Sequence, residues 1–415
     1  MGFDLNIQKS FERLSEPPYR LEDVFKPPDY DWPGDYEGRS LLAFCCHYAV
    51  SGKKIPCMDA LVGGLAGGAN AQGFFGAEYG AGPTDEQQLS GCSWYLRGLT
   101  AYAELFGDKT AADFARRTVH NLFLPALEFY DDYPVRRDGK NSGGVYGNRA
   151  ETAGNWRLST DIGCAFIPVD GLANYYALTR DAALETPLAR MIDIFTDIDK
   201  VGLKMQTHAT LTAARGILKF YEATGDPKYL GYVKELFDLY VKHGMTLTYE
   251  NFNWFGRPDT WTEPCAVVDS LILAIELYKK TGGASYKKYA RRIWFNGLQF
   301  CQRPNGGAGI NTCVTEQQPF LRVSDYEAVQ CCTMRYAEGL LYYHNNRALF
   351  EPESGGVCDE DNRYFLGDCL LAEDIGGTFA ERETFAVGGR ALIRIPSLNS
   401  VSEEQALHAC LKVSF

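Results

Sequence analysis

Long apolar runs and clusters of basic residues are both missing from this sequence. No stretch reaches the roughly 18 consecutive apolar residues of a transmembrane helix, and residues 1–14 lack the apolar segment of a secretory signal peptide. The chain has 41 lysine and arginine residues against 53 aspartate and glutamate residues, a formal net charge of −12, with no basic patch of the kind that binds nucleic acid. We therefore expect no membrane partner, no nucleic-acid partner and a cytoplasmic location.

Histidine is scarce, and cysteine does not follow a disulfide pattern. Only 6 histidines occur in 415 residues, widely scattered, which argues against enzymes that move protons between paired histidines. The 13 cysteines are an odd number and include two adjacent pairs, Cys45-Cys46 and Cys331-Cys332. Adjacent pairs suit a disulfide framework poorly, so we expect reduced thiols.

Helical periodicity dominates the middle of the chain. Hydrophobic residues make up 46% of the sequence and charged residues 23%, as in ordinary globular proteins. Between about residues 39 and 345, apolar residues recur at i, i+3, i+4 and i+7, which predicts helices. The clearest such segments are residues 93–106, 170–178, 210–224, 229–243 and 266–280. We expect a mainly α protein.

The two ends of the chain have a different character. Residues 1–38 are rich in proline, aspartate and tyrosine and predict an extended N-terminal arm. Residues 347–415 contain short apolar runs between glycine, aspartate and proline, which predict strands. These runs are residues 364–366, 369–371, 391–395 and the strand-like end at 407–415.

Several predicted helices end in a similar way, which indicates a weak internal repeat. The endings are Leu105-Phe106-Gly107-Asp108, Leu178-Thr179-Arg180-Asp181, Ala223-Thr224-Gly225-Asp226 and Lys280-Thr281-Gly282-Gly283. Their spacing of about 45 to 75 residues accommodates a helical hairpin with loops, as in helical solenoids and closed α/α barrels. Glycine-rich segments at residues 63–82 and 305–309 are expected to form functional loops.

Two separate segments predict a metal site. Glu263-Pro264-Cys265 opens one predicted helix, and Cys331-Cys332 immediately precedes another. A helix N-terminus favours the thiolate form of cysteine, and three thiolates with one carboxylate suit tetrahedral Zn²⁺. The ion and its four ligands would carry a net charge of −2 (2 − 4), and Arg335 is expected by helical spacing to offset it.

A second interpretation of the same cysteines stays open. Free cysteine is among the most buried residue types, so Cys265, Cys331 and Cys332 can equally be small hydrophobic core residues. Cys45-Cys46-His47 is another candidate metal cluster, but adjacent helical residues diverge around the axis. We expect that segment to be core.

The sequence resembles glycoside hydrolase family 127, the β-L-arabinofuranosidase family. The motifs that carry the resemblance are Glu250-Asn251-Phe252, Thr262-Glu263-Pro264-Cys265, YARRIWFNGL at residues 289–298, Gln302-Arg303-Pro304-Asn305-Gly306-Gly307, and Cys331-Cys332. The resemblance covers about residues 30–400 and is most specific between residues 205 and 345. The resemblance implies an (α/α)6 barrel, here residues 39–346, followed by a β-rich segment that forms part of a β-sandwich at 347–415.

The resemblance also implies roles for individual residues. The zinc ligands would be Glu263, Cys265, Cys331 and Cys332. Cys331 would be the nucleophile, and Glu250 the acid/base of a retaining glycosidase that releases β-L-arabinofuranose or a related sugar from plant-type glycans. The predicted substrate-binding residues are His208, Glu86 in the segment 85–92, and Trp254, whose ring can stack on a sugar.

Two alternatives remain. A non-catalytic carbohydrate-binding or scaffold protein on the same barrel is favoured by Asp85 and Cys92, which stand where the family commonly has histidines. A sugar epimerase is the other, and the small number of histidines argues against it. The oligomeric state stays open.

Overall fold

The computed structural model describes residues 2–25, 31–135, 147–315 and 327–350, together with three short strands near the C-terminus. Helices make up most of the described chain, so the prediction of a mainly α protein is confirmed.

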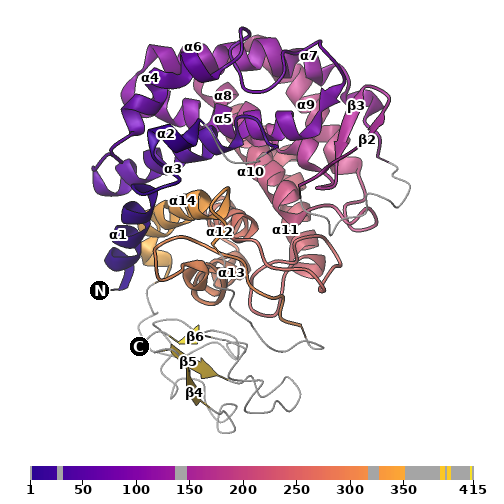
Figure 1. The fold of residues 1–415 in the computed structure, drawn as a ribbon. Helices are drawn as coiled ribbons and strands as arrows, with labels where there is room; N and C mark the ends of the chain where they lie inside the picture. Colours follow the sequence, from indigo (N-terminus) through magenta and orange to yellow (C-terminus); the bar gives the residue numbers. More distant parts are fainter. Residues whose placement is uncertain are drawn as a thin grey trace.

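Among the described residues, six helices form a closed inner ring (Figure 1). In ring order they are α3 (Asp35–Ser51), α5 (Glu86–Phe106), α8 (Pro168–Thr179), α10 (Thr207–Thr224), α12 (Pro264–Thr281) and α14 (Cys332–Asn345). Each contacts the next, and α14 contacts α3. In α12, every residue from Pro264 to Ile275 is buried, as expected of a helix covered on all sides by other helices.

A second set of helices packs on the outside of this ring. These are α1 (Gly2–Leu14), α4 (Met58–Gly68), α6 (Lys109–Thr118), α9 (Ala182–Asp197), α11 (Pro227–His243) and α13 (Ala284–Arg292), each in contact with at least one inner helix. They bury only one side: α6 buries Ala111, Phe114, Ala115 and Thr118, which is helical spacing. The inner and outer helices therefore alternate along most of the chain.

The repeated helix endings form the turn between an inner and an outer helix. The inner helix is followed by a residue in the left-handed conformation, and the next residue is an aspartate whose side chain caps the outer helix. These pairs are Gly107-Asp108 (φ 65°), Arg180-Asp181 (φ 55°) and Gly225-Asp226 (φ 75°). Glycine adopts this conformation without strain, and the aspartate oxygen satisfies free N–H groups at the helix start.

Short helical segments connect the larger ones. They are α2 (Leu21–Val24), α7 (Leu124–Leu127), the π-helical η1 (Val119–Phe123) and η4 (Ile293–Gly297), and the 3₁₀ segments η2 (Tyr130–Asp132), η3 (Cys164–Phe166), η5 (Leu298–Cys301) and η6 (Arg347–Leu349).

Two small sheets accompany the helices. In the first, β3 (Trp156–Ser159) lies between β1 (Thr84–Asp85), to which it is parallel, and β2 (Arg149–Ala153), to which it is antiparallel. In the second, β4 (Thr384–Val387), β5 (Arg390–Ile393) and β6 (Lys412–Val413) are antiparallel neighbours. The strands β5 and β6 overlap predicted strands, while the predictions at 364–366 and 369–371 lie outside the described residues.

Three sequence predictions about local structure are wrong. The N-terminal arm is not extended: it contains α1 and α2, and α1 packs on α14 and α3, with the Phe11 ring edge-on to His47. The helix after the arm begins at Asp35 rather than near residue 39. The glycine-rich segment at 63–82 is helical as far as Gly68, because Leu61 and Leu65 bury one side of α4 at helical spacing.

Candidate metal centre and active site

Glu263, Cys265, Cys331 and Cys332 form one cluster. Each offers a ligand atom, and these atoms all lie within 4.8 Å of one another. The Cys332 sulfur lies 3.6 Å from that of Cys265 and 3.4 Å from that of Cys331. Sulfurs bound to zinc in a tetrahedron at about 2.3 Å stand roughly 3.8 Å apart, so the spacing suits a shared ion. The prediction that these four side chains meet is confirmed.

The ring of inner helices explains why two distant segments meet. Pro264 is the first residue of α12, which puts Glu263 at its N-cap and Cys265 in its first turn. Cys331 is the N-cap residue of α14, and Cys332 is its first residue. Because α12 and α14 are neighbours in the ring, both helix starts lie together, where the positive ends of the helix dipoles favour anionic side chains.

The composition of the cluster calls for a cation. The Glu263 carboxyl is buried against three thiols, and burial together with the nearby Cys265 charge raises its pKa well above the usual value. Burying acidic groups against one another is unfavourable unless positive charge is present. Three sulfurs and one carboxylate oxygen are donors that a divalent ion such as zinc accepts.

The three sulfurs are not equivalent. Hydrogen bonds from the Cys265 and Cys332 thiols lower the pKa of Cys331, whereas burial raises the pKa of Cys265 to about 11 and that of Cys332 well above its usual value. Cys331 is also partly exposed, while Cys265 and Cys332 are buried. Cys331 is therefore the sulfur that favours the thiolate and that another molecule can reach.

Two asparagines hold Glu263 from the segment that follows Glu250. The Glu263 backbone N–H donates to Asn251 Oδ1 at 2.8 Å. In the amide orientation that its partners require, Asn253 donates to Glu263 Oε2 at 2.7 Å and accepts from Trp261 Nε1 at 3.2 Å. These contacts fix the carboxylate toward the sulfurs. The sequence motif did include Asn251, but Asn253 was not predicted.

Glu250 lies beside this segment, entirely buried. Its Oε1 accepts hydrogen bonds from Asn311 Nδ2 at 2.8 Å and Thr262 Oγ1 at 3.2 Å, and its Oε2 accepts from Thr248 Oγ1 at 3.0 Å. Burial raises its pKa from 4.5 to about 7, although these hydrogen bonds and the charge of Arg303 act in the opposite direction. A carboxyl group with a pKa near neutrality is suited to both giving and taking a proton.

Arg303 and Gly297, which belong to two of the family motifs, help to fix the position of Glu250. Arg303 donates to Asn311 Oδ1 at 3.1 Å, and Asn311 in turn donates to Glu250. Tyr249, directly before Glu250, has a φ of 61°, which is unusual for a bulky residue. A β-carbon on Gly297 would lie 3.1 Å from the Tyr249 carbonyl oxygen and 3.4 Å from Glu250 Cγ, so the absence of a side chain there makes room for this turn.

His208 stands in the first turn of α10 with both ring nitrogens in contact with protein groups. Nδ1 lies 3.0 Å from Asp269 Oδ2, and Nε2 lies 3.4 Å from Arg39 Nη2. The indole of Trp94 stacks on the ring with centroids 5.8 Å apart. His208 therefore lies close to the cluster, and its contact with a sugar stays a prediction.

Arg335 interacts with the cluster through its charge, since burial lowers the pKa of Arg335 but the charge of Cys265 acts to raise it. Its guanidinium pairs with Asp269 and Glu338, both buried. The N–H group that reaches a ligand sulfur belongs to Arg39 in α3, whose Nη1 lies 3.7 Å from Cys265 Sγ. Spacing along one helix suggested Arg335, but the ring brings α3 to the same place.

The two other predicted substrate-binding residues are fully buried. Glu86 begins α5 and accepts hydrogen bonds from Tyr133 Oη and Ser159 N, both at 2.6 Å. Trp254 packs edge-on against Trp261, with ring centroids 5.3 Å apart. Trp261 is partly exposed, so it is the more accessible of the two rings. Sugar contact by Glu86 and Trp254 stays a prediction.

Asp161 is a nearby carboxyl that sequence reasoning missed. It lies in the loop before α8, its Oδ1 is buried without a hydrogen-bond partner, and burial raises its pKa to about 7. Its charge contributes to the raised pKa of Glu263, which indicates that the two are close. No motif surrounds this residue, so only the fold distinguishes it.

Cys45, Cys46 and His47 are buried in α3, as predicted for core residues. His47 accepts or donates a hydrogen bond with Ser10 Oγ at 3.0 Å, and burial lowers its pKa to about 4. His47 is therefore part of the packing between α3 and α1.

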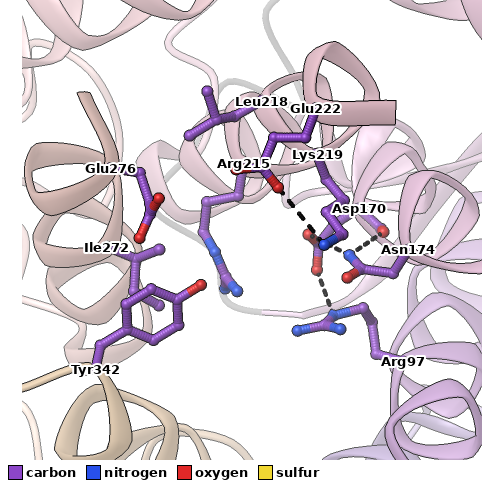
Figure 2. A pocket seen from close by; sticks show the side chains of 10 residues that line it. All are labelled: Arg97, Asp170, Asn174, Arg215, Leu218, Lys219, Glu222, Ile272, Glu276 and Tyr342. Carbon is purple, nitrogen blue, oxygen red and sulfur yellow. Dashed lines mark hydrogen bonds and ion pairs between the residues drawn. The ribbon is translucent and has the colours of Figure 1, made fainter. Parts of the chain in front are cut away.

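A polar cavity of about 240 Å³ lies along later turns of the same inner helices. Figure 2 shows the Arg215 guanidinium pointing into the space between Tyr342 and Arg97, with Arg97 paired to Asp170. Because the cysteine cluster lies at the first turns of α12 and α14, this cavity is at a different level of the ring. It brings charges of both signs together, and each of these three charged side chains has an ion-pair partner.

Several solved enzyme structures have a fold similar to that of this chain. Similar solved structures include an unsaturated glucuronyl hydrolase specific for heparin, with 12% identity and a TM-score of 0.55, covering 85% of this chain and 99% of that chain. A GH127 β-arabinofuranosidase has 12% identity and a TM-score of 0.52, covering 82% and 56%. A GH127 β-L-arabinofuranosidase from Geobacillus stearothermophilus T6 has 11% identity and a TM-score of 0.50, covering 94% and 64%. At such identities the similarity shows the fold alone, and these neighbours are (α/α)6 toroid enzymes.

The family follows from the sequence. Residues 97–345, more than half of the chain, match the model of the β-L-arabinofuranosidase, GH127 catalytic domain. The chain therefore belongs to glycoside hydrolase family 127, as its motifs predict. Among curated proteins, none matches the chain in sequence.

The chain spans only part of some of the related structures. It spans 58% and 56% of the length of two of the glycoside hydrolases that it matches in structure. Within the described part of the chain, no helix is both long and apolar enough to cross a membrane.

Proposed function

We propose that this protein is a zinc-dependent retaining glycosidase that releases β-L-arabinofuranose or a related sugar from plant-type glycans. The observation that carries the proposal is the cluster of Glu263, Cys265, Cys331 and Cys332, whose ligand atoms lie within 4.8 Å of one another. Membership of the family, whose name gives the sugar, supports the carbohydrate substrate.

The four clustered side chains are the proposed ligands of the ion. When bound, zinc would keep the sulfurs as thiolates at neutral pH and offset part of their charge. Cys331 is the proposed nucleophile because it is the partly exposed sulfur of the three. Cys265 and Cys332 are buried and serve as fixed ligands.

In the first step, the Cys331 thiolate attacks the anomeric carbon while the bond from that carbon to the leaving oxygen breaks. Glu250 gives its proton to the leaving oxygen. Water then attacks the same carbon, Glu250 takes a proton from it, and the carbon–sulfur bond breaks to restore the thiolate. Two inversions at one carbon leave the configuration retained, as with the two carboxylates of other retaining glycosidases. The pKa of Glu250, near 7, supports both of its roles.

The proposed domain organisation follows the sequence boundaries. Residues 39–346 would form an (α/α)6 barrel catalytic domain, residues 1–38 an N-terminal segment and residues 347–415 a β-rich C-terminal segment. The inner ring that closes from α14 back to α3 supports the barrel. His208, Glu86 and Trp254 would bind the sugar.

The experiment that tests this proposal is replacement of Cys331 by serine. Turnover of aryl β-L-arabinofuranoside should fall below detection, whereas the far-UV circular dichroism should match that of the wild type. Cys57→Ser is the matched control, because Cys57 is also partly exposed and its thiol donates to the Tyr19 carbonyl, a bond that serine can make. Substantial activity in Cys331→Ser would exclude Cys331 as the nucleophile.

A non-catalytic carbohydrate-binding protein is the second candidate. It is favoured by Asp85, whose carboxylate caps α5 and pairs with Arg149, and by Cys92, whose thiol is buried against the Pro33 carbonyl, because both stand where the family commonly has histidines. Calorimetric binding of arabinose-containing oligosaccharides without hydrolysis of a panel of furanosides and pyranosides would support it. Detectable hydrolysis by the wild type that Cys331→Ser loses would exclude it.

A further inference from the structure

Arg39 uses each nitrogen of its guanidinium on a different partner. Nε lies 2.8 Å from both carboxylate oxygens of Asp35, one helical turn earlier in α3. Nη1 faces Cys265 Sγ at 3.7 Å, and Nη2 faces His208 Nε2 at 3.4 Å. The flat face of the group covers Trp94, with Cζ 4.0 Å from the ring centroid. Only 5% of Arg39 is exposed.

These contacts fix the ring of His208. A guanidinium can only donate hydrogen bonds, so Nε2 of His208 must be an acceptor toward Arg39. The other nitrogen, Nδ1, then carries the proton that it shares with the Asp269 carboxylate. The orientation of His208 therefore depends on Arg39 on one side and Asp269 on the other.

Arg39 also supplies positive charge next to the negatively charged cluster. Four deprotonated ligands and one divalent ion sum to −2 (2 − 4), and such an excess of negative charge in a buried site requires compensation. Arg39 supplies a cation in contact with a ligand sulfur. Arg335, the cation expected from the sequence, pairs with Asp269 and Glu338, just as Arg39 pairs with Asp35, but Arg39 also has an N–H group that faces a ligand sulfur.

We propose that Arg39 is a positioning residue of the metal centre, where it holds Cys265 Sγ and His208 Nε2 in place and offsets the negative charge of the ligands. This inference rests on the metal centre of the proposed function. It assigns the residue to binding of the ion, because Arg39 Nη1 lies 3.7 Å from the sulfur of Cys265, a buried ligand. Groups that orient a metal ligand from outside typically change metal affinity by about 10- to 100-fold when they are removed.

Lysine is not expected to replace Arg39. A lysine ammonium is a point charge on a flexible stem, whereas the planar guanidinium reaches Asp35, Cys265 and His208 at once. Arg39→Lys should therefore keep most of the charge but lose the geometry. An affinity between those of the wild type and Arg39→Met is expected.

The test is titration of metal-free full-length protein with Co²⁺ alone, in competition with a chelator of known affinity. The wild type should take up one Co²⁺ per chain with an intense thiolate-to-cobalt absorption band. Arg39→Met should bind Co²⁺ about 10- to 100-fold more weakly and shift this band, because the N–H group on one ligand sulfur is lost.

The matched control is Arg97→Met. Arg97 is also a largely buried arginine of the inner ring, and it pairs with Asp170, as Figure 2 shows, and with Glu338, neither of which is one of the four ligands. Its loss should lower the melting temperature but leave Co²⁺ affinity within about threefold of the wild type and the band unmoved. Equal affinity and an equal band in Arg39→Met and Arg97→Met would overturn the proposal.

Two further outcomes are decisive. If Arg39→Met does not fold, Asp35→Asn tests the same idea, because this substitution releases Arg39 from its carboxylate partner. Weaker Co²⁺ binding by Asp35→Asn supports the proposal. Unchanged Co²⁺ binding with an unchanged absorption band overturns the proposal. If the wild type binds neither Co²⁺ nor Zn²⁺, the metal centre of the proposed function is wrong. A wild type that binds the ion and an Arg39→Met variant that binds it equally well would refute the inference about Arg39 alone.

Discussion

The hydrogen bond from Asn311 to Glu250 gives a sharp prediction about the pH dependence of the reaction. Asn311 Nδ2 donates to Glu250 Oε1 at 2.8 Å, and this bond lowers the pKa of Glu250 against the larger effect of burial. Removing a donor to a carboxylate favours the protonated acid. Asn311→Ala should therefore raise the pKa of Glu250 above the wild-type value of about 7.

The magnitude follows from the strength of such bonds. A hydrogen bond to a charged group contributes about 1.5 kcal/mol or more, which corresponds to about one pKa unit. If Glu250 is the acid, kcat/KM of the wild type should fall above pH 7, and in Asn311→Ala it should fall about one unit higher. At pH 8, relative to its own acid plateau, the variant should retain about fivefold more activity.

The assay is kcat/KM on an aryl furanoside from pH 5 to 9, compared with Asn174→Ala. The Asn174 side chain bonds Asp170 in α8 and has no contact with Glu250, so its removal should leave the profile unmoved. A profile in Asn311→Ala that stays at the wild-type position, or moves to lower pH, would refute the assignment of Glu250 as the titrating acid.

Three further predictions concern stability and the metal. Because the folded-state pKa of Glu250 is raised from 4.5 to about 7, its contribution to stability is fully present below about pH 4.5 and is lost as the pH rises through 7. The unfolding free energy of the wild type, minus that of Glu250→Gln, should therefore fall by about 2 to 3 kcal/mol between pH 5 and 8. A difference that does not change with pH would contradict the raised pKa. Gly38→Ala should destabilise the protein by about 3 kcal/mol in denaturant unfolding, because the added carbon would lie 2.1 Å from the Tyr95 backbone nitrogen. A β-carbon on Gly63 would have nothing within 4 Å, so Gly63→Ala should be neutral or slightly stabilising. Equal effects of the two substitutions would show that α3 and α5 can separate freely. Removing bound metal with a chelator should lower both the melting temperature and the activity, and added Zn²⁺ should restore them; full activity after verified metal removal would exclude a catalytic metal.

The repeated helix endings illustrate what local sequence can predict. A helix ending needs a residue that tolerates the left-handed conformation, followed here by an aspartate that caps the next helix, and both requirements are met by adjacent residues. Gly107-Asp108 and Gly225-Asp226 could therefore be recognised without coordinates. The helix α1 was missed because the prolines and aspartates of residues 17–33 obscured the helical spacing of Phe11 and Leu14.

The metal cluster could be predicted only in part from the sequence. The four ligands could be predicted from cysteine and glutamate residues near predicted helix starts, because only a few residue types bind zinc. Their meeting in space depends on the neighbouring positions of α12 and α14 in the ring, which no local pattern encodes.

The sequence by itself determined the most regularly periodic helices, the repeated helix endings and the candidate ligands, because each depends on neighbouring residues or on the chemistry of single side chains. Only the tertiary structure decided that Arg39, rather than Arg335, reaches Cys265, that Asn311 bonds Glu250, and that Asp161 lies near Glu263. Those contacts join segments from 61 to 226 residues apart, and closure of the helical ring brings them together.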